Sequence, residues 1–270
     1  MAERMQGRVL IVAGSDSGGG AGLQADIKTV TALGGYAMTA VTALTAQTTE
    51  GVYGVQGIDP GFIQQQMRVS LDDLGADCIK TGMLHSTEVI EAVAEVLAEV
   101  SDIPVVVDPV MVAQSGADLL QPDAVRSLLR SMLPHAAVLT PNLPEAEKLS
   151  GLQIPDIDAA AHAARTLLTL GVPAALLKGG HLTGDELTDM LATEAGLERF
   201  TERRIPTEQT HGTGCTLASA IATGLAQGLG LRDAVVRARA YLRGALAHAP
   251  GFGRGQGPVN HAWAIPRFDG

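Results

Sequence analysis

The stretch RVLIVAGSDSGGGAGLQADIKTVTALGG, residues 8–35, decides the fold class. Its apolar start, residues 8–14, contains β-branched side chains and is typical of a buried parallel strand. The glycine-rich loop that follows leads to a helix that we expect to begin near Ala21 and to end at Gly34 and Gly35. The stretch therefore predicts one strand–loop–helix unit of an α/β fold.

The same alternation continues along the rest of the chain. Short apolar runs are followed by segments in which apolar residues recur at helical spacing. This repetition favours a mainly parallel sheet covered by helices on both faces, with ligands at the carboxyl ends of the strands. An antiparallel pair at the sheet edge is expected at 187–192 and 199–205. The other expected strands are 36–44, 77–82, 104–111, 136–142 and 173–180, and the other expected helices are 60–74, 88–100, 124–132, 158–170, 215–228 and 233–248.

The composition supports a large aliphatic core. The chain has 270 residues, of which 46% are hydrophobic and only 3% aromatic, and it contains 32 glycines. Small aliphatic side chains allow close packing of helices on strands. Because no linker, repeat or low-complexity block divides the sequence, we expect a single domain over residues 1–270, with a short extension at 1–7 and a Gly/Pro-rich loop at 250–258.

Charge and cysteine content exclude several classes of protein. The formal charge of -10 gives no long-range attraction to nucleic acid or to an acidic membrane. The longest basic run is the pair Arg203 and Arg204, so an anionic ligand must be held locally. Cys78 and Cys215 lie far apart in the sequence, which gives neither a disulfide framework nor metal-ligand spacing. No segment has the length of a signal-peptide core or a membrane span, so we expect a cytoplasmic protein without nucleic-acid or membrane partners.

A second glycine-rich turn, HGTGC at residues 211–215, opens a helix of small apolar residues. Its glycines let the backbone approach a ligand, and the N–H groups of residues 212–215 point out of the first helical turn, which predicts a site for phosphate or a developing negative charge. The same position favours a thiolate at Cys215, because cysteines at helix N-termini can have pKa values of roughly 3.5–7.5 instead of about 8.5. Alternatively, Cys215 is a small buried residue after a helix cap.

The glycines of the first turn satisfy only a relaxed dinucleotide-binding pattern. Gly20, Gly22 and Ala25 occupy its positions, but the second expected strand runs on to Ala46 and Gln47 and supplies no acidic residue for a ribose. The chain also lacks the G-x-x-x-x-G-K-[ST] motif of P-loop enzymes. A tight turn that needs positive φ is the alternative, although five glycines in nine residues exceed what a plain turn requires.

Polar side chains follow three later strands. Asn142 and Glu145, three residues apart at a helix start, can hold Mg²⁺ through water or can simply cap the helix. Lys178 ends the next strand and is either a phosphate partner or a snorkelling surface residue. Asp108 follows three valines and can act on a ligand or cap the next turn. The seven histidines form no H-x-x-x-H pair, so His211 is expected to form hydrogen bonds and not to bind a metal.

Seven short motifs occur in one order along the chain: GSDSGGGAGLQADIKT, TALTAQ, KTGML, VVVDPVM, TPNLPEAE, LLKGGH and THGTGCT. In this series the sequence resembles the hydroxymethylpyrimidine/phosphomethylpyrimidine kinases of thiamine biosynthesis, a branch of the ribokinase-like superfamily. The resemblance runs from about Val9 to His261. It implies a three-layer α/β/α sandwich with a mainly parallel sheet and a small flap, usually in a homodimer. It also implies Mg²⁺- and ATP-dependent phosphorylation of 4-amino-5-hydroxymethyl-2-methylpyrimidine to its monophosphate and then to its diphosphate.

The resemblance implies one set of residues for the pyrimidine. Asp26, Gln47 and Met83 would line the pyrimidine pocket, where Gln47 and a backbone edge would read the amine and a nitrogen of the ring. Asp108 and Val110 would form the opposite wall.

A second implied set acts on phosphate. Gly212, Thr213 and Gly214 would form an anion hole. Cys215 stands where ribokinase-like sugar kinases place an aspartate base in a G-x-G-D turn, so we expect this thiol to accept the proton of the hydroxyl group. The side chains implied to face ATP are Lys178, Asn142, Glu145 and Thr210, with Glu145 also implied to hold Mg²⁺ through water.

Pyridoxal kinases of the same branch are the main alternative. The resemblance implies a second cysteine in the flap of the pyridoxal-specialised members, and residues 111–120 contain none. This favours the pyrimidine substrate and leaves a pyridoxal side activity open. The flap also carries Gln114 where many relatives have a lysine.

Two further alternatives come from other classes of protein. A non-catalytic pyrimidine-binding sensor could lose the anion hole, which is intact here. An NAD-dependent oxidoreductase would need the missing ribose-binding acid. We also expect no fused thiamine-phosphate synthase domain.

Overall fold

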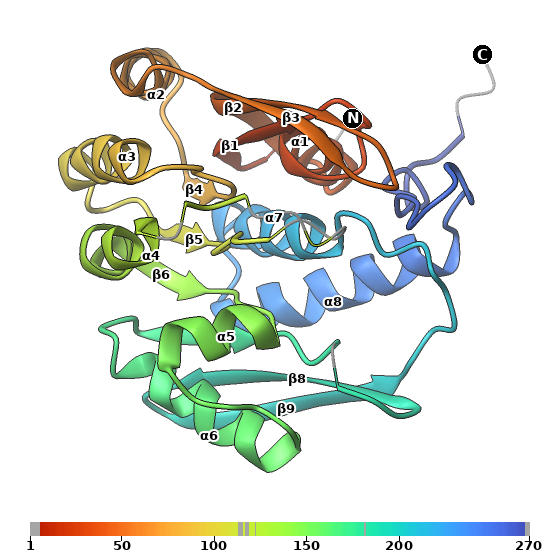
Figure 1. Ribbon diagram of the computed structural model, residues 1–270. Coiled ribbons are helices and arrows are strands. Elements are labelled where there is room, and N and C mark those ends of the chain that lie inside the picture. Colours follow the sequence, from red (N-terminus) through yellow and green to blue (C-terminus); the bar gives the residue numbers. More distant parts are fainter. Residues whose placement is uncertain (1–5, 113–115, 117–118, 122, 181, 268–270) are drawn as a thin grey trace.

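The computed structural model describes residues 6–112, 116, 119–121, 123–180 and 182–267. In this part of the chain nine strands form one sheet in the order β3-β2-β1-β4-β5-β6-β7-β8-β9 (Figure 1). The six strands from β2 to β7 in this order run parallel, which confirms the mainly parallel sheet. The strands are β1 (Arg8–Asp16), β2 (Tyr36–Gln47), β3 (Val52–Gly57), β4 (Cys78–Thr81), β5 (Val105–Val107), β6 (Ala136–Leu139), β7 (Ala174–Leu177), β8 (Glu186–Thr193) and β9 (Gly196–Arg203).

Helices cover both faces of the sheet (Figure 1). Alternate side chains of β1 point in opposite directions: Val9 and Ile11 pack with α1, α7 and α8, whereas Leu10 and Val12 pack with the helices of the other face. The two buried clusters are the two seams of a three-layer sandwich, as expected. The helices are α1 (Gly22–Ala32), α2 (Pro60–Asp73), α3 (Thr87–Glu99), α4 (Ala124–Ser127), α5 (Leu143–Ser150), α6 (Ile157–Leu168), α7 (Thr213–Ala226) and α8 (Leu231–Ala247).

Both antiparallel edges of the sheet have polar or exposed strands. The expected pair at 187–192 and 199–205 is confirmed as β8 and β9, which pair antiparallel from Glu186 with Arg203 to Thr193 with Gly196. The opposite edge strand, β3, was not predicted. Its sequence VYGVQG contains two glycines and most of it is exposed, so it lacks the apolar alternation that indicates a half-buried strand.

Several expected elements differ in extent, and two of these differences are the largest. The strand expected at 104–111 ends at Val107, so Asp108 lies directly beyond the carboxyl end of β5. The helix expected at 124–132 keeps α-helical geometry only to Ser127, continues as a π-helical turn to Met132 and closes with a 3₁₀ turn, Leu133–His135. Pro134 lies in that last turn, where its missing N–H group cannot continue an α-helix.

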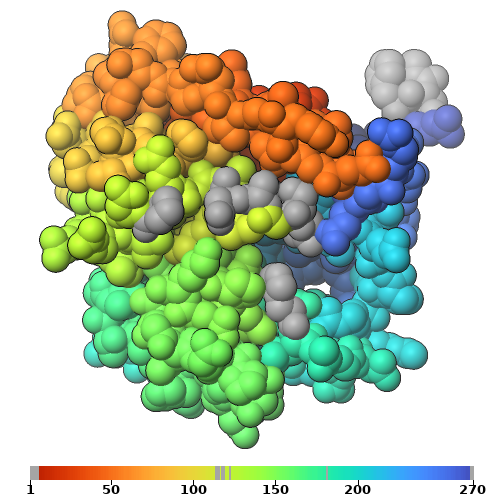
Figure 2. Space-filling view, in the orientation of Figure 1, coloured from red at the N-terminus to blue at the C-terminus, as the bar shows by residue number. Residues whose placement is uncertain are grey.

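The C-terminal loop contacts the N-terminal part of the molecule. Residues 250–258 form no helix or strand, as expected, and the amides of Arg254 and Gly255 donate to Thr49 Oγ1 at 3.2 and 3.1 Å. Figure 2 shows the dark-blue C-terminal segment against the orange surface that contains β2 and β3. The segment between β2 and β3 is therefore tied to the end of the described chain.

Candidate active site

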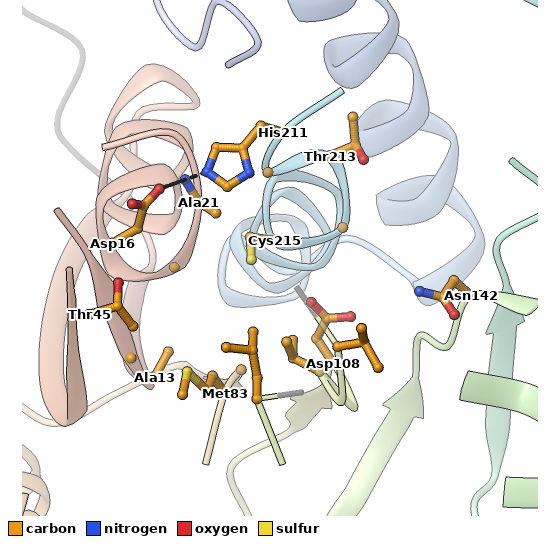
Figure 3. A pocket seen from close by; sticks show the side chains of 18 of the residues that line it. Ala13, Asp16, Ala21, Thr45, Met83, Asp108, Asn142, His211, Thr213 and Cys215 are labelled. Carbon is orange, nitrogen blue, oxygen red and sulfur yellow. Dashed lines mark hydrogen bonds and ion pairs between the residues drawn. The ribbon is translucent and has the colours of Figure 1, made fainter. Parts of the chain in front are cut away.

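A cavity of about 200 Å³ opens at the carboxyl ends of the parallel strands, where the sequence predicts a ligand site. Its wall joins segments that are far apart in the sequence, from the loop after β1 to the start of α7. In Figure 3, Cys215 lies between the Asp16–His211 pair and Asp108. The residues predicted from the sequence that line this cavity are Gln47, Met83, Asp108, Val110, Asn142, Glu145, Lys178, Gly212, Thr213, Gly214 and Cys215.

The start of α7 has the geometry of an anion-binding turn. Gly212 is the N-cap in the left-handed conformation, with a φ of 82°, and no side chain caps this helix. A Cβ atom at this residue would overlap the carbonyl oxygen of Gly20, so the two glycine-rich turns meet backbone to backbone. The Thr213 amide donates to the carbonyl oxygen of Thr210 at 3.3 Å and the Thr216 amide to that of Gly212 at 2.9 Å, so the amides of Gly214 and Cys215 are those without an acceptor within the α-helix. The turn can therefore receive a phosphate oxygen.

The environment of Cys215 differs from the sequence-based expectation of a thiolate. Burial raises the pKa of the Cys215 thiol to about 12, and the carboxylates of Asp26 and Asp108 add to this rise. Lys80 and the amide of Gly22 act in the opposite direction without cancelling it. The expected lowering is wrong because loss of hydration outweighs the helix N-terminus. The side chain itself is half-buried and lines the cavity.

Asp26 is a second correction. It was expected to line the pyrimidine pocket, but its side chain is 0% exposed and lies outside the cavity wall. Lys80 Nζ donates to its two carboxylate oxygens at 2.9 and 2.8 Å, and Ser219 Oγ donates to Asp26 Oδ1 at 2.7 Å. The carboxylate is therefore used inside the protein. Lys80 lines the cavity and was missed, although a lysine in the buried strand CIKT already requires a carboxylate partner.

Lys178 lies on the other side of the cavity and has two carboxylates near it. Its Nζ donates to Asp108 Oδ1 at 2.9 Å and lies 3.9 Å from Glu145 Oε2. Thr140 Oγ1 donates to the same Asp108 oxygen at 3.1 Å. Burial opposes the charge of Lys178, but Asp108 and Glu145 outweigh burial and hold its pKa above the usual range. Lys178 is thus a charged residue at the cavity and not a snorkelling surface residue.

Asn142 and Glu145 cap α5 and also face the cavity. Asn142 Oδ1 accepts from the Glu145 amide at 2.9 Å, and Glu145 Oε2 accepts from the Asn142 amide at 2.8 Å, which is a complete capping box. Burial raises the pKa of Glu145 to about 7, Lys178 opposes this and Asp108 adds to it. The helix-capping alternative is confirmed, and it leaves the Glu145 carboxylate in the cavity wall.

A hydrogen-bonded group formed by Asp16, His211 and Gln47 links the first glycine-rich turn to α7. Asp16 accepts from the amides of Gly18, Gly20 and Ala21 at 2.8–3.0 Å, so this turn is filled by its own carboxylate. His211 Nε2 lies 2.8 Å from Asp16 Oδ2 and 3.2 Å from Gln47 Nε2 (Figure 3 shows the Asp16 contact).

Asp16 is held in its ionised form by these contacts. Burial alone would raise its pKa, but His211 and the amides of Ala21 and Gly18 outweigh burial and lower it. The hydrogen-bonding role expected for His211 is confirmed. Sequence reasoning missed Asp16, although an aspartate inside a glycine-rich turn is a signal for this kind of amide contact.

The wall near Gln47 is apolar. Met83 is 6% exposed and packs with Ala43 and Leu119, and Val110 packs against this small cluster. Thr42 Oγ1 donates to the carbonyl oxygen of Met83 at 2.6 Å and fixes the backbone there. A flat apolar ring with polar edges fits such a wall, since ligand pockets combine apolar surface with a few placed polar groups.

Thr210 lies on a neighbouring cavity of about 320 Å³. This second cavity shares Lys178, Gly180, Thr213 and Gly214 with the first, and it continues toward β8, β9 and α8. Gln114 of the expected flap lies outside the described residues. Among the described residues, no three His, Cys, Asp or Glu side chains gather as they would for a metal ion, and no helix is long and apolar enough to cross a membrane.

The fold and the cavity at its strand ends define a ribokinase-like kinase. The model of the phosphomethylpyrimidine kinase family matches residues 16–260. This match covers most of the sequence, so the chain belongs to that family.

Individual relatives agree with this membership. The chain is 52% identical over 259 residues to the thiamine biosynthesis bifunctional protein of Geobacter sulfurreducens, covering 96% of the chain but only 53% of that protein. It is 46% identical over 257 residues to the hydroxymethylpyrimidine/phosphomethylpyrimidine kinase of Streptomyces coelicolor, covering 95% of each. The structure resembles the ADP complex of Bacillus subtilis pyridoxal kinase with a TM-score of 0.88 at 33% identity, covering 95% of this chain and 98% of that one.

Proposed function

We propose that the chain uses ATP to phosphorylate 4-amino-5-hydroxymethyl-2-methylpyrimidine to its monophosphate and then to its diphosphate, in thiamine biosynthesis. One observation carries the proposal: the start of α7, Lys178 and Cys215 line the same cavity as Gln47 and Met83. Membership of the phosphomethylpyrimidine kinase family supports the same substrate.

The phosphate side works mainly by positioning and charge. The amides of Gly212, Thr213 and Gly214 would receive the oxygens of the transferred phosphoryl group, and Lys178 would neutralise the charge that spreads over them. Cys215 would accept the proton of the attacking hydroxyl group. Because its thiol has a raised pKa in the free protein, it needs a nearby cation to act as a thiolate.

The pyrimidine would lie against Met83 and Val110, with Gln47 at the polar edge of the ring. The ring presents an amine that donates and ring nitrogens that accept, and a primary amide can satisfy one of each. Asp108 is held by Lys178 and Thr140 at the opposite wall, so it would set the position of Lys178 close to the reacting hydroxymethyl group.

The second cavity would hold the nucleoside of ATP. It shares Lys178, Gly180, Thr213 and Gly214 with the first cavity, so a nucleotide lying across both would bring its terminal phosphate to α7. Leucines 187, 242 and 246 line the second cavity and suit an adenine ring, and Thr210 lies at the junction. The ADP complex of the Bacillus subtilis kinase supports a nucleotide site in this fold.

Magnesium fits the residues beside Lys178. Asp108 and Glu145 place two carboxylates near one ammonium group, so this side of the cavity has an excess of negative charge. Glu145 already accepts from the amides of Asn142 and Met111, so its remaining lone pairs suit contact through water, which Mg²⁺ retains when it binds. The ion would neutralise phosphate charge during transfer.

The direct test is a turnover assay with ATP and Mg²⁺ on the pyrimidine alcohol, its monophosphate and pyridoxal, side by side. We expect turnover of both pyrimidines. A pyridoxal kinase is the second candidate, because the Bacillus subtilis pyridoxal kinase has the same fold along nearly the whole chain. Turnover of pyridoxal alone would contradict the assignment to pyrimidines.

Cys215→Ala tests the chemical step. A general base contributes at least about 100-fold, so we expect turnover to fall by that factor or more while ATP affinity stays within about twofold. Cys78→Ala is the matched control, because it changes the other thiol at a residue outside the cavity wall. A Cys215→Ala variant that keeps wild-type turnover would leave Cys215 only a positional role.

The assembly and location belong to the same proposal. We propose one domain over residues 1–270 that acts in the cytoplasm as a homodimer. Exposed apolar side chains on three neighbouring elements support an interface: Leu44 on β2, Tyr53 and Val55 on β3, and Phe62 and Val69 on α2.

A further inference from the structure

Lys80 carries a charge in the core of the protein, at the floor of the cavity. It lies in β4, between β1 and β5, and its side chain is 0% exposed to solvent. Asp26 accepts two of its three N–H donors. Burial opposes the charge of Lys80, but Asp26, Cys215 and Asp108 outweigh burial and keep its pKa above the usual range. The ammonium group is thus a permanent buried cation.

Three elements fix this cation beneath the start of α7. Ser219 lies one helical turn after Cys215, on the same face of α7, and it donates to Asp26 on α1. At residue 82, a Cβ atom would lie only 3.0 Å from Lys80 Nζ, so the glycine there leaves room for the buried ammonium group. Lys80 and Cys215 both line this cavity.

Two cations near Cys215 favour its thiolate: Lys80, and Lys178, whose own pKa is raised by Cys215. Burial raises the pKa of the thiol most, Asp26 and Asp108 raise it further, and Lys80 is the largest influence that lowers it. Without Lys80, two buried carboxylates would face the sulfur with less compensation. The titratable groups in the cavity wall with the thiol are Lys80 on β4, Asp108 after β5, Glu145 on α5, Lys178 after β7, and the paired Asp16 and His211; Asp26 on α1 lies outside the wall and binds Lys80.

We propose that Lys80 is a positioning residue that acts through Cys215: its ammonium group, fixed by Asp26, is the counter-charge of the Cys215 thiolate. The inference rests on the proposed function. The thiol first releases its proton to solvent through the cavity. The thiolate then takes the hydroxyl proton as the alcohol oxygen bonds to the γ-phosphorus, and the bond from that phosphorus to ADP breaks.

The rate of Cys215 alkylation by iodoacetamide between pH 6 and pH 10, which rises with pH as the thiolate fraction grows below the pKa of the thiol, tests the inference without any substrate. Peptide mass spectrometry separates Cys215 from Cys78, which is 0% exposed and serves as an internal control for unfolding. In Lys80→Met we expect the alkylation curve to move to higher pH and the rate at pH 8 to fall by at least about 10-fold, which corresponds to one pKa unit. In Asp26→Asn we expect the curve to move to lower pH. The two variants break the same ion pair. If this pair had only a structural role, both substitutions would shift the alkylation curve in the same direction.

A double variant protects the test against poor folding of Lys80→Met. Lys80→Met/Asp26→Leu removes both charges and leaves none unpaired, so it avoids an isolated buried carboxylate. The alkylation curve of the double variant should still be shifted to higher pH than that of the wild type, because Lys80 changes the pKa of Cys215 more than Asp26 does.

Two results would overturn the inference. The first is that the alkylation curves of Lys80→Met and Asp26→Asn shift in the same direction while Cys78 stays protected. The second is that the folded double variant has the same alkylation curve as the wild type. Failure of the proposed function is distinguishable, because it would appear as loss of pyrimidine turnover in the wild type while the alkylation curves still separate as described.

Discussion

Two buried ion pairs contribute side chains to the cavity that Cys215 lines, and they differ in their exposure to solvent. Lys80 and Asp26 are both 0% exposed, with one ammonium group matched to one carboxylate. Lys178 and Asp108 are 14% and 2% exposed, and Glu145 adds a second carboxylate at 3.9 Å from Lys178. The first pair is closed and balanced, whereas the second is open to the cavity and carries an excess of negative charge.

This difference separates two tasks. A closed pair cannot be reached by a ligand, so its field at Cys215 stays the same through a catalytic cycle. An open pair with a surplus carboxylate can exchange partners when a phosphate or a cation arrives. The closed pair should therefore govern stability and thiol chemistry, and the open pair should govern the handling of phosphate.

Breaking the closed pair should give the largest effect. We expect Lys80→Met to lower the free energy of unfolding by about 3–5 kcal/mol, because it leaves the Asp26 carboxylate buried without its partner. Lys80→Met/Asp26→Leu should recover most of this loss. Urea unfolding followed by circular dichroism measures both variants. If the double variant is no more stable than the single one, the lysine contributes by packing and not by charge.

Breaking the open pair should act on turnover instead. We expect Lys178→Met to lower kcat by about 10²–10³, the range found when one preorganised charge-stabilising group is removed. Its loss of stability should be smaller than that of Lys80→Met, since Lys178 is partly hydrated. Steady-state kinetics and urea unfolding of the same preparation check both parts. Lys148→Met, on the exposed side of α5, is the control for removal of a lysine.

Removing the charge of Glu145, the second carboxylate beside Lys178, should have the smallest of the three effects. The size of this effect on stability should depend on pH. The folded pKa of Glu145 is about 7, above its ordinary value of 4.5, so the folded state disfavours its ionisation. Stability is therefore lost as the pH rises through this interval, and Glu145→Gln should raise the free energy of unfolding at pH 8 by about 1–3 kcal/mol. The gain should vanish near pH 4. Urea unfolding without nucleotide or Mg²⁺ measures it, and an equal gain at both values of pH would contradict it.

The sequence predicted the sheet well where strands are buried and poorly where they are not. A continuous apolar run such as residues 8–14 is typical of a strand that is buried on both faces. The hydrophobic pattern alone therefore locates such a strand. The exposed strand β3 has no such pattern and depends on its antiparallel pairing with β2, which runs from Gln47 with Val52 to Ala43 with Gly57. The π-helical turn after α4 likewise depends on packing that periodicity does not describe.

The site was predictable in outline but not in its electrostatics. Strand ends and the two glycine-rich turns indicated where a ligand should lie, and the family resemblance supplied residues that mostly line the cavity. Burial decided the rest. Asp26 lies in the core and not in the expected pocket wall, and partial burial of Cys215 raises the pKa of its thiol. Spacing along a chain does not report how much water remains around a side chain after folding.

The contact between the two glycine-rich turns also determines when the site can form during synthesis. His211 lies 195 positions from its partner Asp16, and Ser219 lies 193 positions from Asp26. On the ribosome, the first turn is synthesised long before α7. Asp16 and the neighbouring glycines therefore lack their contacts with α7 during most of synthesis. Active enzyme can therefore form only after α7 has emerged. Nascent chains that stop before residue 211 should contain a partly formed sheet but no complete active site.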